Sequence, residues 1–289
     1  MMKRSNGYKE FDLNYSYLEL VSRGIISLID RNKTSFYLNQ FRLFFKEEDN
    51  CYLELVGYKI ANYLGIRSVS YDLAKIVFND RVINGVVSED FREEDYNIVN
   101  FNTIFNDYME EVPEENIGNE MNLEFIYKVL NYRYRNYNNS QFIVHKIMDE
   151  LINYFMLDML IGNYDNGKYN YEIMENDRDV KNCPYYDFGN SFIFKKTRFT
   201  VSDSNNYDIY DNLLEFLFKY DCSYVCRFID MFNKLSPSKL EEIFVEIEND
   251  IDYKLDVNFK NILFLAYSRH YEKISDILIK NKMISTMKK

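Results

Sequence analysis

The chain has no tryptophan, and its 289 residues include only three prolines and nine glycines. So few prolines and glycines exclude long disordered linkers, which are rich in these residues. No hydrophobic run approaches the ~20 residues that a membrane-spanning helix needs, and no apolar segment follows the basic N-terminus as in a secretory leader. Aliphatic and aromatic residues make up 47% of the chain, which is enough for a sizeable core. We therefore expect a cytoplasmic protein of one large domain or two lobes, with no membrane contact.

Cysteine and histidine are also scarce, and no basic run is present. The four cysteines lack metal-ligand spacing, since Cys222 and Cys226 are separated by three residues with no histidine nearby. Buried free thiols in a reducing compartment are therefore expected. The two histidines, His145 and His270, fall on predicted helices with no nucleophile elbow, which argues against a Ser-His-Asp hydrolase. A net charge of −11 argues against direct binding to nucleic acid or to an anionic membrane.

The first third of the chain is predicted to form a small antiparallel sheet with one helix. Residues 35–46 are rich in aromatic side chains and partly alternating, as expected of strands, and the run ends on Lys46. Apolar residues of segment 53–65 recur at spacings of three and four, which predicts a helix of about three turns. Two further strands are expected at residues 73–78 and 81–87.

A lysine at a strand end and a glutamate on the next helix can form an ion pair that holds the ammonium group against ATP phosphates. Lys46 and Glu54 occupy these two positions. The alternative is that both side chains are merely solvated, as exposed Lys and Glu usually are. The motifs further along the chain favour the ion pair.

The best domain boundary follows the predicted sheet, where residues 86–91 lead into an acidic, irregular stretch that extends to about residue 122. We therefore predict an N-terminal nucleotide-binding lobe at residues 1–91 and a catalytic, helical C-terminal lobe at residues 92–289. In a two-lobed kinase this boundary would be the hinge that reads adenine, with Glu89 and Phe91 beside the base.

Periodicity predicts that the second part is mainly helical, apart from one hairpin. The hairpin would be made by strands at residues 169–174 and 180–187. Helices are expected at residues 123–134, 140–160 with Ser140 as N-cap, 211–220, 223–232, from about 237, and 259–280.

The strongest chemical signal lies after the long helix, where residues 161–170 read I-G-N-Y-D-N-G-K-Y-N, and later residues 187–189 read D-F-G. The Asp-x-x-x-x-Asn spacing followed by D-F-G is that of the kinase signature. In phosphoryl transfer from ATP, one carboxylate handles the hydroxyl proton, while an amide oxygen and a second carboxylate hold Mg²⁺. Asp165 would be the first group, and Asn170 and Asp187 the other two. Each motif alone can arise by chance, but together they bracket the predicted hairpin, which favours a single site.

In this arrangement the chain resembles the HipA-like kinases, in particular the shorter proteins built around the C-terminal kinase region. The resemblance extends over about residues 35–278 through scattered motifs. These are Phe45-Lys46, Glu54 with residues 60–66 (I-A-N-Y-L-G-I), residues 85–91 (G-V-V-S-E-D-F), residues 161–170, and residues 184–189 (P-Y-Y-D-F-G).

The resemblance implies a two-lobed, protein-kinase-like α+β fold with a small N-terminal β lobe and a larger helical lobe. It implies that Lys46, paired with Glu54, holds ATP phosphates, that Asp165 is catalytic, and that Asn170 and Asp187 bind Mg²⁺. The family phosphorylates Ser or Thr of proteins and often itself. A protein substrate or a toxin–antitoxin type of partner is therefore expected.

One departure from the family pattern concerns the catalytic loop. The family usually reads Asp-Arg-His-x-x-Asn, whereas Asn166 and Gly167 stand here in place of the Arg and His. Lys168 is then the candidate to supply a cation near the γ-phosphate. The segments 22–24 and 31–34 are the best candidates to cover ATP, although neither is glycine-rich. A pseudokinase or nucleotide-sensing module, and a small-molecule phosphotransferase, are the alternatives.

Overall fold

The computed structural model describes residues 4–5, 7–12, 33–38, 41–47, 51–78, 81–112, 122–164, 167–202 and 208–284. Two compact units make up the chain. The first contains Met1–Phe91, Tyr186–Gly189 and Leu240–Lys260, and the second contains Arg92–Tyr185, Asn190–Lys239 and Asn261–Lys289. The candidate ATP-covering segment 22–24, the first half of segment 31–34 and the catalytic candidate Asp165 lie outside the described residues.

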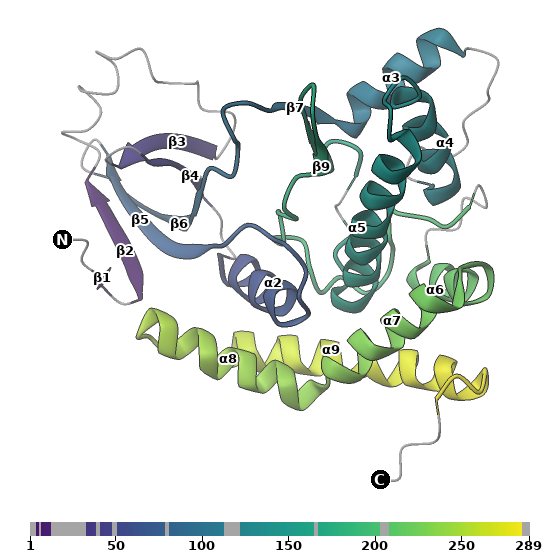
Figure 1. Cartoon of the computed structure of the whole chain (residues 1–289). Coiled ribbons are helices and arrows are strands. Elements are labelled where there is room, and N and C mark those ends of the chain that lie inside the picture. The colour runs from purple at the N-terminus through teal and green to yellow at the C-terminus, as the bar shows by residue number, and fades with distance from the viewer. Residues whose placement is uncertain are drawn as a thin grey trace. The chain divides into compact units, whose positions relative to one another are not determined.

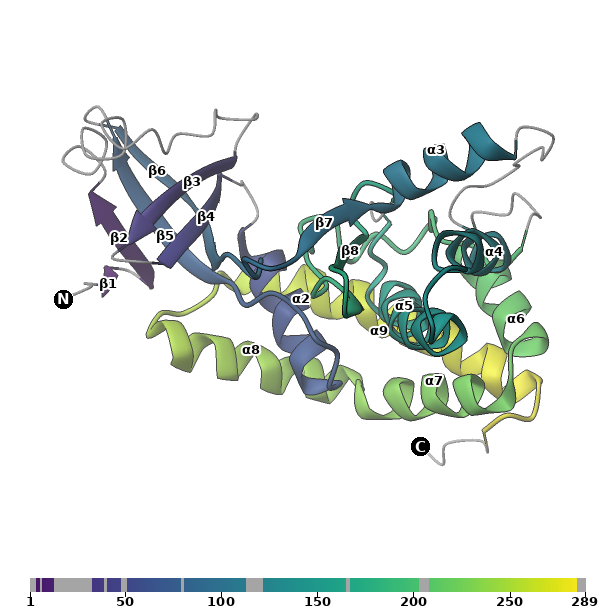
Figure 2. The same cartoon turned by 45° about the horizontal axis from the view of Figure 1, so that its top comes forward.

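The first unit contains a six-stranded sheet with the strand order β1-β2-β5-β6-β4-β3 (Figure 2). Its strands are β1 (Arg4–Ser5), β2 (Tyr8–Asp12), β3 (Lys33–Leu38), β4 (Phe41–Glu47), β5 (Asp72–Phe78) and β6 (Arg81–Glu89). Neighbouring strands pair antiparallel except β2 and β5, which run parallel. Strands β3 to β6 match the predicted antiparallel sheet, whereas β1 and β2 have no counterpart in the prediction.

The core of this sheet follows from alternation along its strands, since every second side chain points to the same face. Its buried members are Phe11, Leu43, Phe45, Ala74, Ile76 and Val87. Helix α2 (Cys51–Tyr63) lies against β5 and β6 and buries Val56, Ile60 and Ala61 completely. The predicted helix at residues 53–65 is therefore present, with its start two residues earlier.

The first unit also contains the junction between two C-terminal helices, α8 (Pro237–Ile251) and α9 (Val257–Lys280). The buried Glu248 carboxylate accepts hydrogen bonds from the ammonium groups of Lys254 (2.8 Å) and Lys260 (2.5 Å) and from the backbone N–H of Leu255 (3.1 Å). A buried carboxylate needs such partners, so Glu248 fixes the path of the chain from one helix to the next.

The second unit is built around the long helix α5 (Ser140–Ile161), which contacts α4, α7 and strand β9 (Figure 1). It also contains α3 (Phe101–Glu111), α4 (Leu123–Arg133), α6 (Ile209–Lys219), α7 (Cys222–Lys234) and the larger part of α9. A three-stranded antiparallel sheet, β7 (Asn97–Asn100), β8 (Glu172–Glu175) and β9 (Val180–Asn182), completes it. The predicted hairpin corresponds to β8 and β9, and it is shorter than expected.

The largest error of the sequence prediction lies between residues 92 and 122, which were expected to be irregular but contain β7 and α3. Asn100 caps α3, because its Oδ1 accepts a hydrogen bond from the Thr103 N–H (2.9 Å). Buried residues at helical spacing follow, namely Phe101, Ile104, Phe105 and Tyr108. Both the cap and the spacing were therefore readable signals. Ser140 was also wrongly assigned as an N-cap, since Asn139 precedes α5 and makes no side-chain cap bond.

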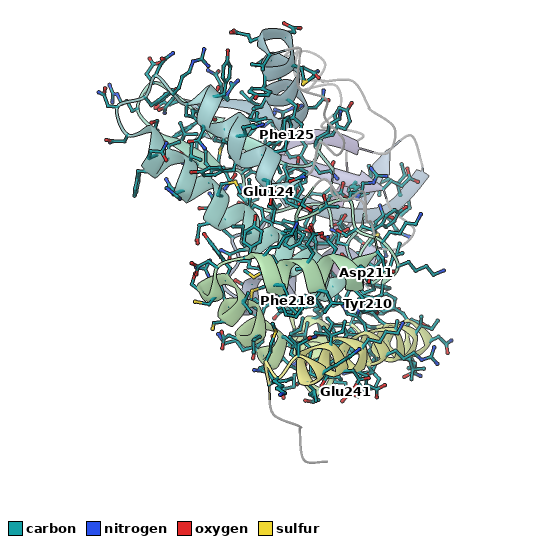
Figure 3. The ribbon with its side chains drawn as sticks, turned by 90° about the vertical axis from the view of Figure 1, so that its right-hand side faces the viewer. Glu124, Phe125, Tyr210, Asp211, Phe218 and Glu241 are labelled. Carbon is teal, nitrogen blue, oxygen red and sulfur yellow. The ribbon has the colours of Figure 1, made fainter. Side chains whose placement is uncertain are left out.

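Side-chain caps explain where two other helices of this unit begin. Figure 3 labels residues of their first turns, Glu124 and Phe125 on α4 and Tyr210 and Asp211 on α6. Asn122 Oδ1 accepts hydrogen bonds from the N–H groups of Glu124 (2.8 Å) and Phe125 (3.2 Å) at the start of α4. Asp208 does the same at the start of α6, with Tyr210 (2.9 Å) and Asp211 (3.2 Å) as donors. Each cap satisfies N–H groups that the first helical turn leaves without partners.

The four cysteines divide into two pairs by exposure. Cys51 and Cys183 are buried free thiols, as predicted, but Cys222 and Cys226 are exposed. Both exposed residues lie on α7, whose buried face is made by Val225, Phe228, Met231 and Phe232. Helical spacing therefore puts the two cysteines outside the buried stripe. In the described part of the chain, no helix is both long and apolar enough to span a bilayer.

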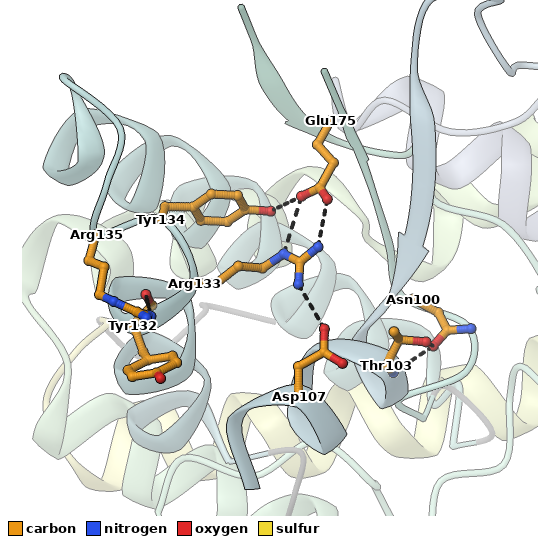
Figure 4. A network of polar contacts seen from close by, with 8 residues as sticks. All are labelled: Asn100, Thr103, Asp107, Tyr132, Arg133, Tyr134, Arg135 and Glu175. Carbon is orange, nitrogen blue, oxygen red and sulfur yellow. Dashed lines mark hydrogen bonds and ion pairs between the residues drawn. The ribbon is translucent and has the colours of Figure 1, made fainter. Parts of the chain in front are cut away.

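An ion-pair network connects three elements of the second unit (Figure 4). The Arg133 guanidinium at the end of α4 donates to both oxygens of Glu175 on β8 (2.6 and 3.2 Å) and to Asp107 on α3 (3.1 Å). The Tyr134 hydroxyl donates to Glu175 as well (2.9 Å). Since a two-pronged guanidinium–carboxylate contact fixes orientation as well as distance, the network holds α3 and α4 to the sheet that carries the hairpin.

Candidate functional site

Lys46 is the centre of a charged cluster in the first unit. Its Nζ lies 2.7 Å from Glu54 Oε1 and 2.7 Å from Asp187 Oδ1. Strand β4 delivers the lysine, and the first turn of α2 delivers Glu54, which is completely buried. Burial alone would lower the pKa of Lys46, but the charges of Glu54 and Asp187 outweigh it and raise that pKa. The ammonium group therefore stays charged at neutral pH.

Glu54 also holds the D-F-G segment. Its second oxygen, Oε2, accepts a hydrogen bond from the backbone N–H of Phe188 (2.7 Å). The backbone N–H of Asp187 donates to the Tyr71 hydroxyl (3.1 Å), and Asp187 has a left-handed backbone with a φ of 69°. Non-glycine residues adopt this region rarely, often at functional sites. The contacts from Glu54 and Tyr71 thus stabilise a backbone conformation that aims the Asp187 carboxylate at Lys46.

The Phe188 side chain holds this segment against helix α2. Its side chain is completely buried and packs edge-on against Tyr71, with ring centroids 6.3 Å apart. It lies directly on Gly57 of α2, where an added Cβ would come within 2.4 Å of the ring. A glycine is therefore required at position 57 for Phe188 to approach the helix this closely.

The strand predicted for residues 180–187 is wrong in its second half. Strand β9 ends at Asn182, and Asp187 lies five residues further on, in irregular structure. A left-handed residue cannot continue a strand, because its φ lies outside the extended region. The sequence pattern gives no sign of this, since Asp187 is held by contacts with residues far away in the chain.

The second candidate group lies in the second unit, in the loop that follows α5. The helix ends at Ile161, and Gly162 follows as its C-cap in the left-handed conformation, with a φ of 62°. The loop then rests on the first turn of α3, because the N–H groups of Phe101 and Asn102 donate to the carbonyls of Tyr171 (3.0 Å) and Lys168 (3.0 Å). The unpredicted helix α3 thus supports the segment that carries Lys168 and Asn170.

Lys168 and Asn170 are both half-buried in this loop, where the Asn170 N–H donates to the Gly167 carbonyl (2.9 Å). A further cation, Arg198, was not predicted. Its guanidinium lies 5.9 Å from the centre of the Tyr164 ring, and Nη1 is 3.6 Å from where a Cβ of Gly167 would be. Arg198 therefore stands beside the position at which the HipA-like pattern has its histidine.

The two predicted hinge residues differ in exposure. Glu89 is exposed at the end of β6, where it pairs with Leu43 of β4. Phe91 is half-buried and stacks on Tyr186, with ring centroids 6.0 Å apart. This places Phe91 next to the D-F-G segment of the first unit. Contact of either residue with adenine stays a prediction.

The metal ligands predicted from sequence fall in different units, Asn170 in the second and Asp187 in the first. Among the described residues, no group of three or more His, Cys, Asp or Glu could hold a metal ion by itself. A kinase site does not need such a group, since Mg²⁺ commonly takes one or two protein ligands and completes its shell with phosphates and water. One carboxylate and one amide oxygen are donors of the kind that Mg²⁺ prefers.

Several solved structures share this fold, and two of them illustrate the similarity. The proinflammatory kinase CtkA of Helicobacter pylori is similar with a TM-score of 0.64 and 18% identity, over 95% of this chain and 98% of that chain. HipA of Shewanella oneidensis MR-1, solved with HipB and operator DNA, is similar with a TM-score of 0.50 and 12% identity, over 90% of this chain and 70% of that chain. The chain has a HipA-like kinase fold.

This fold confirms the α+β class predicted from the sequence, with a small N-terminal sheet, one helix beside it and a larger helical region. No family model matches the sequence, and no curated protein matches it by sequence. The kinase-like fold was nevertheless recognisable from a few motifs, because these motifs are tied to particular elements rather than to overall identity.

His270 packs against the end of α5, just before the loop that carries Lys168 and Asn170, within the second unit. It is buried on α9, its Nε2 contacts the Met159 carbonyl near the end of α5 (2.8 Å), and its Nδ1 contacts the Tyr210 hydroxyl (3.0 Å). Since a carbonyl only accepts, Nε2 carries the proton of a neutral ring. The ring also stacks on Phe194 (4.0 Å between centroids), which in turn covers Gly162.

A pH dependence of stability follows from this burial. Burial lowers the pKa of His270 from 6.5 to about 3, so the unfolded chain binds a proton that the folded chain does not. The contribution of His270 to the free energy of unfolding is full above pH 6.5 and should fall by about 1.4 kcal/mol per pH unit below it. Urea unfolding between pH 6.5 and 5 measures this slope. His270→Gln should remove this slope, and His145→Gln, at the exposed histidine, should keep it. Equal slopes in the wild type and His270→Gln would contradict the assignment.

Proposed function

We propose that this chain is an ATP- and Mg²⁺-dependent protein kinase of the HipA-like type, which transfers phosphate to Ser or Thr of a protein and to itself. The single observation that carries the proposal is the Lys46 cluster, in which one ammonium group lies 2.7 Å from both a buried glutamate and the D-F-G aspartate. A kinase needs the lysine–glutamate ion pair to present the lysine to the phosphates of ATP, and it needs the D-F-G aspartate nearby to bind Mg²⁺.

Each residue has a role in this proposal. Lys46, held by Glu54, binds the α- and β-phosphates, and Glu89 and Phe91 lie beside adenine. Asp165 takes or orients the proton of the attacking hydroxyl. Lys168 and Arg198 supply positive charge near the γ-phosphate, in place of the Arg-His pair that the loop lacks. Asn170 and Asp187 would hold Mg²⁺, which supplies charge neutralisation on the phosphates when bound.

The proposal is tested by phosphoryl transfer from radiolabelled Mg·ATP. The wild type should label itself or a generic protein substrate, with label on serine or threonine, and Asp187→Asn should reduce the rate about 100-fold or more. Asp177→Asn, at an exposed aspartate in the β8–β9 turn, is the control and should keep the wild-type rate. Equal labelling by the wild type and Asp187→Asn would sink the proposal.

The labelling experiment, combined with thermal unfolding in the presence of Mg·ATP, separates the alternatives. A wild type that gains thermal stability with Mg·ATP but transfers no phosphate to any protein is a nucleotide-sensing module, which the Asn166-Gly167 departure favours. Transfer that appears only with added small hydroxyl compounds indicates a small-molecule phosphotransferase. The solved HipA structure contains HipB, and we propose that this chain also works with a protein partner or substrate of that kind.

A further inference from the structure

A buried carboxylate lies next to the catalytic loop and has no place in the roles given above. Asp158 is in the last turn of α5 and is 2% exposed. Its Oδ2 accepts a hydrogen bond from the Tyr171 hydroxyl (2.6 Å), and its Oδ1 accepts one from the Tyr185 hydroxyl. All three residues belong to the second unit.

The direction of the hydrogen bonds is fixed by the groups that take part. Asn163 donates from Nδ2 to the Tyr185 hydroxyl (3.0 Å), and an amide nitrogen cannot accept a hydrogen bond. Tyr185 therefore uses a lone pair toward Asn163 and its only proton toward Asp158. The backbone N–H of Asn163 also donates to the Asp158 carbonyl (3.1 Å). The result is a directed chain from Asn163 through Tyr185 to a carboxylate that acts only as an acceptor.

The segments that converge on Asp158 are those that carry the proposed chemistry. Asn163 stands two residues before Asp165, Tyr171 directly follows Asn170, and Tyr185 stands two residues before Asp187. We propose that Asp158 is a positioning residue, which holds the loop after α5 and the segment after β9 in the positions that phosphoryl transfer needs. This inference rests on the proposed function.

The surroundings keep the Tyr171 phenol neutral. Burial, and then the charge of Asp158, raise the pKa of Tyr171 well above its ordinary value, so its hydroxyl keeps the proton that it donates. Tyr154 completes the packing, with its ring stacked on Tyr171 (6.3 Å between centroids) and its hydroxyl bonded to the Cys183 carbonyl (3.0 Å). A buried carboxylate is costly without such partners, and its donors here come from the segments that it positions.

The kinetic test compares Asp158→Asn and Tyr185→Phe with Tyr154→Phe, which removes a neighbouring buried hydroxyl that donates to the Cys183 carbonyl. In the first two variants kcat should fall about 10- to 100-fold, as expected when the support of a reacting group is lost, with the KM for Mg·ATP within about twofold of the wild type. Tyr154→Phe should keep kcat. Unchanged kcat in Asp158→Asn and Tyr185→Phe, or an equal loss in all three variants, would overturn the positioning role.

A second measurement is independent of activity. Amide hydrogen exchange at residues 163–164 and 167–171 should speed up at least about tenfold in Tyr185→Phe, because local opening becomes easier, while α2 and β4 of the first unit keep their protection. Unchanged exchange in that loop overturns the inference even if the wild type transfers no phosphate. A wild type without transfer but with faster loop exchange in the variant contradicts the proposed function and supports the role of Asp158 in holding the loop.

Discussion

Replacing Lys46 with methionine is expected to lower the free energy of unfolding by about 3–5 kcal/mol, because it leaves a buried charge without its partner. Glu54 is completely buried, and its Oε1 is 2.7 Å from the lysine ammonium. The loss is far larger than for an exposed ion pair, which contributes at most about 1 kcal/mol. Urea unfolding at pH 7 measures the difference.

Lys59 provides a matched control for this prediction. Its side chain is 22% exposed, as is that of Lys46, but its partner Asp250 is 56% exposed rather than buried. Lys59→Met should therefore cost less than about 1 kcal/mol. If both variants lose the same stability, the burial of Glu54 is not what makes Lys46 important for the fold.

A double variant separates the structural role of Lys46 from its proposed catalytic role. In Lys46→Met/Glu54→Gln the buried negative charge is gone, and the glutamine oxygen can still accept the hydrogen bond that Phe188 donates to Glu54 (2.7 Å). Most of the lost stability should return, while phosphoryl transfer stays reduced about 100-fold or more, because no ammonium group reaches the phosphates. Recovery of transfer together with stability would show that Lys46 serves the fold alone.

Much of the fold could be predicted from local patterns, whereas the geometry of the site could not. Helix α2, strands β4 to β6 and helix α5 were read from periodicity, and Lys46 and Glu54 from their order along these elements. Helix α3 was missed, although the capping residue Asn100 and the spacing of the apolar residues after it indicate a helix. In that case the signal was present, and the acidic composition of the stretch concealed it.

Other features have no local signal. The left-handed conformation of Asp187 depends on Glu54 and Tyr71, which are more than 100 positions away. Arg198 approaches Gly167 from a separate segment, and the parallel pairing of β2 with β5 connects residues 9–12 to residues 74–77. Such contacts are set by tertiary packing, which overrides local propensity. The residue types of the site could be predicted, but not the partners that orient them.

Phe188→Ala is expected to lower the free energy of unfolding by about 3–5 kcal/mol, the usual cost of removing a buried aromatic ring. The ring is completely buried, and Gly57 lies directly beneath it. Phe188 is next to Asp187 in the chain, and its N–H donates to Glu54. Phosphoryl transfer should therefore fall as well. Thermal and urea unfolding of the two purified proteins measure the loss of stability.

Gly57→Ala should cost less stability in the Phe188→Ala background than in the wild type. In the wild type the new Cβ would lie 2.4 Å from the Phe188 ring, and overpacking of about 1–3 kcal/mol exceeds the gain of about 1 kcal/mol from replacing a helical glycine. In Phe188→Ala the ring is absent, but the Cβ of residue 188 remains 2.5 Å from the position of the new Cβ, so only part of the overpacking is relieved and the cost should be smaller. If Gly57→Ala destabilises both backgrounds equally, the two residues are not in contact, and Gly57 must be required for a reason other than the approach of Phe188.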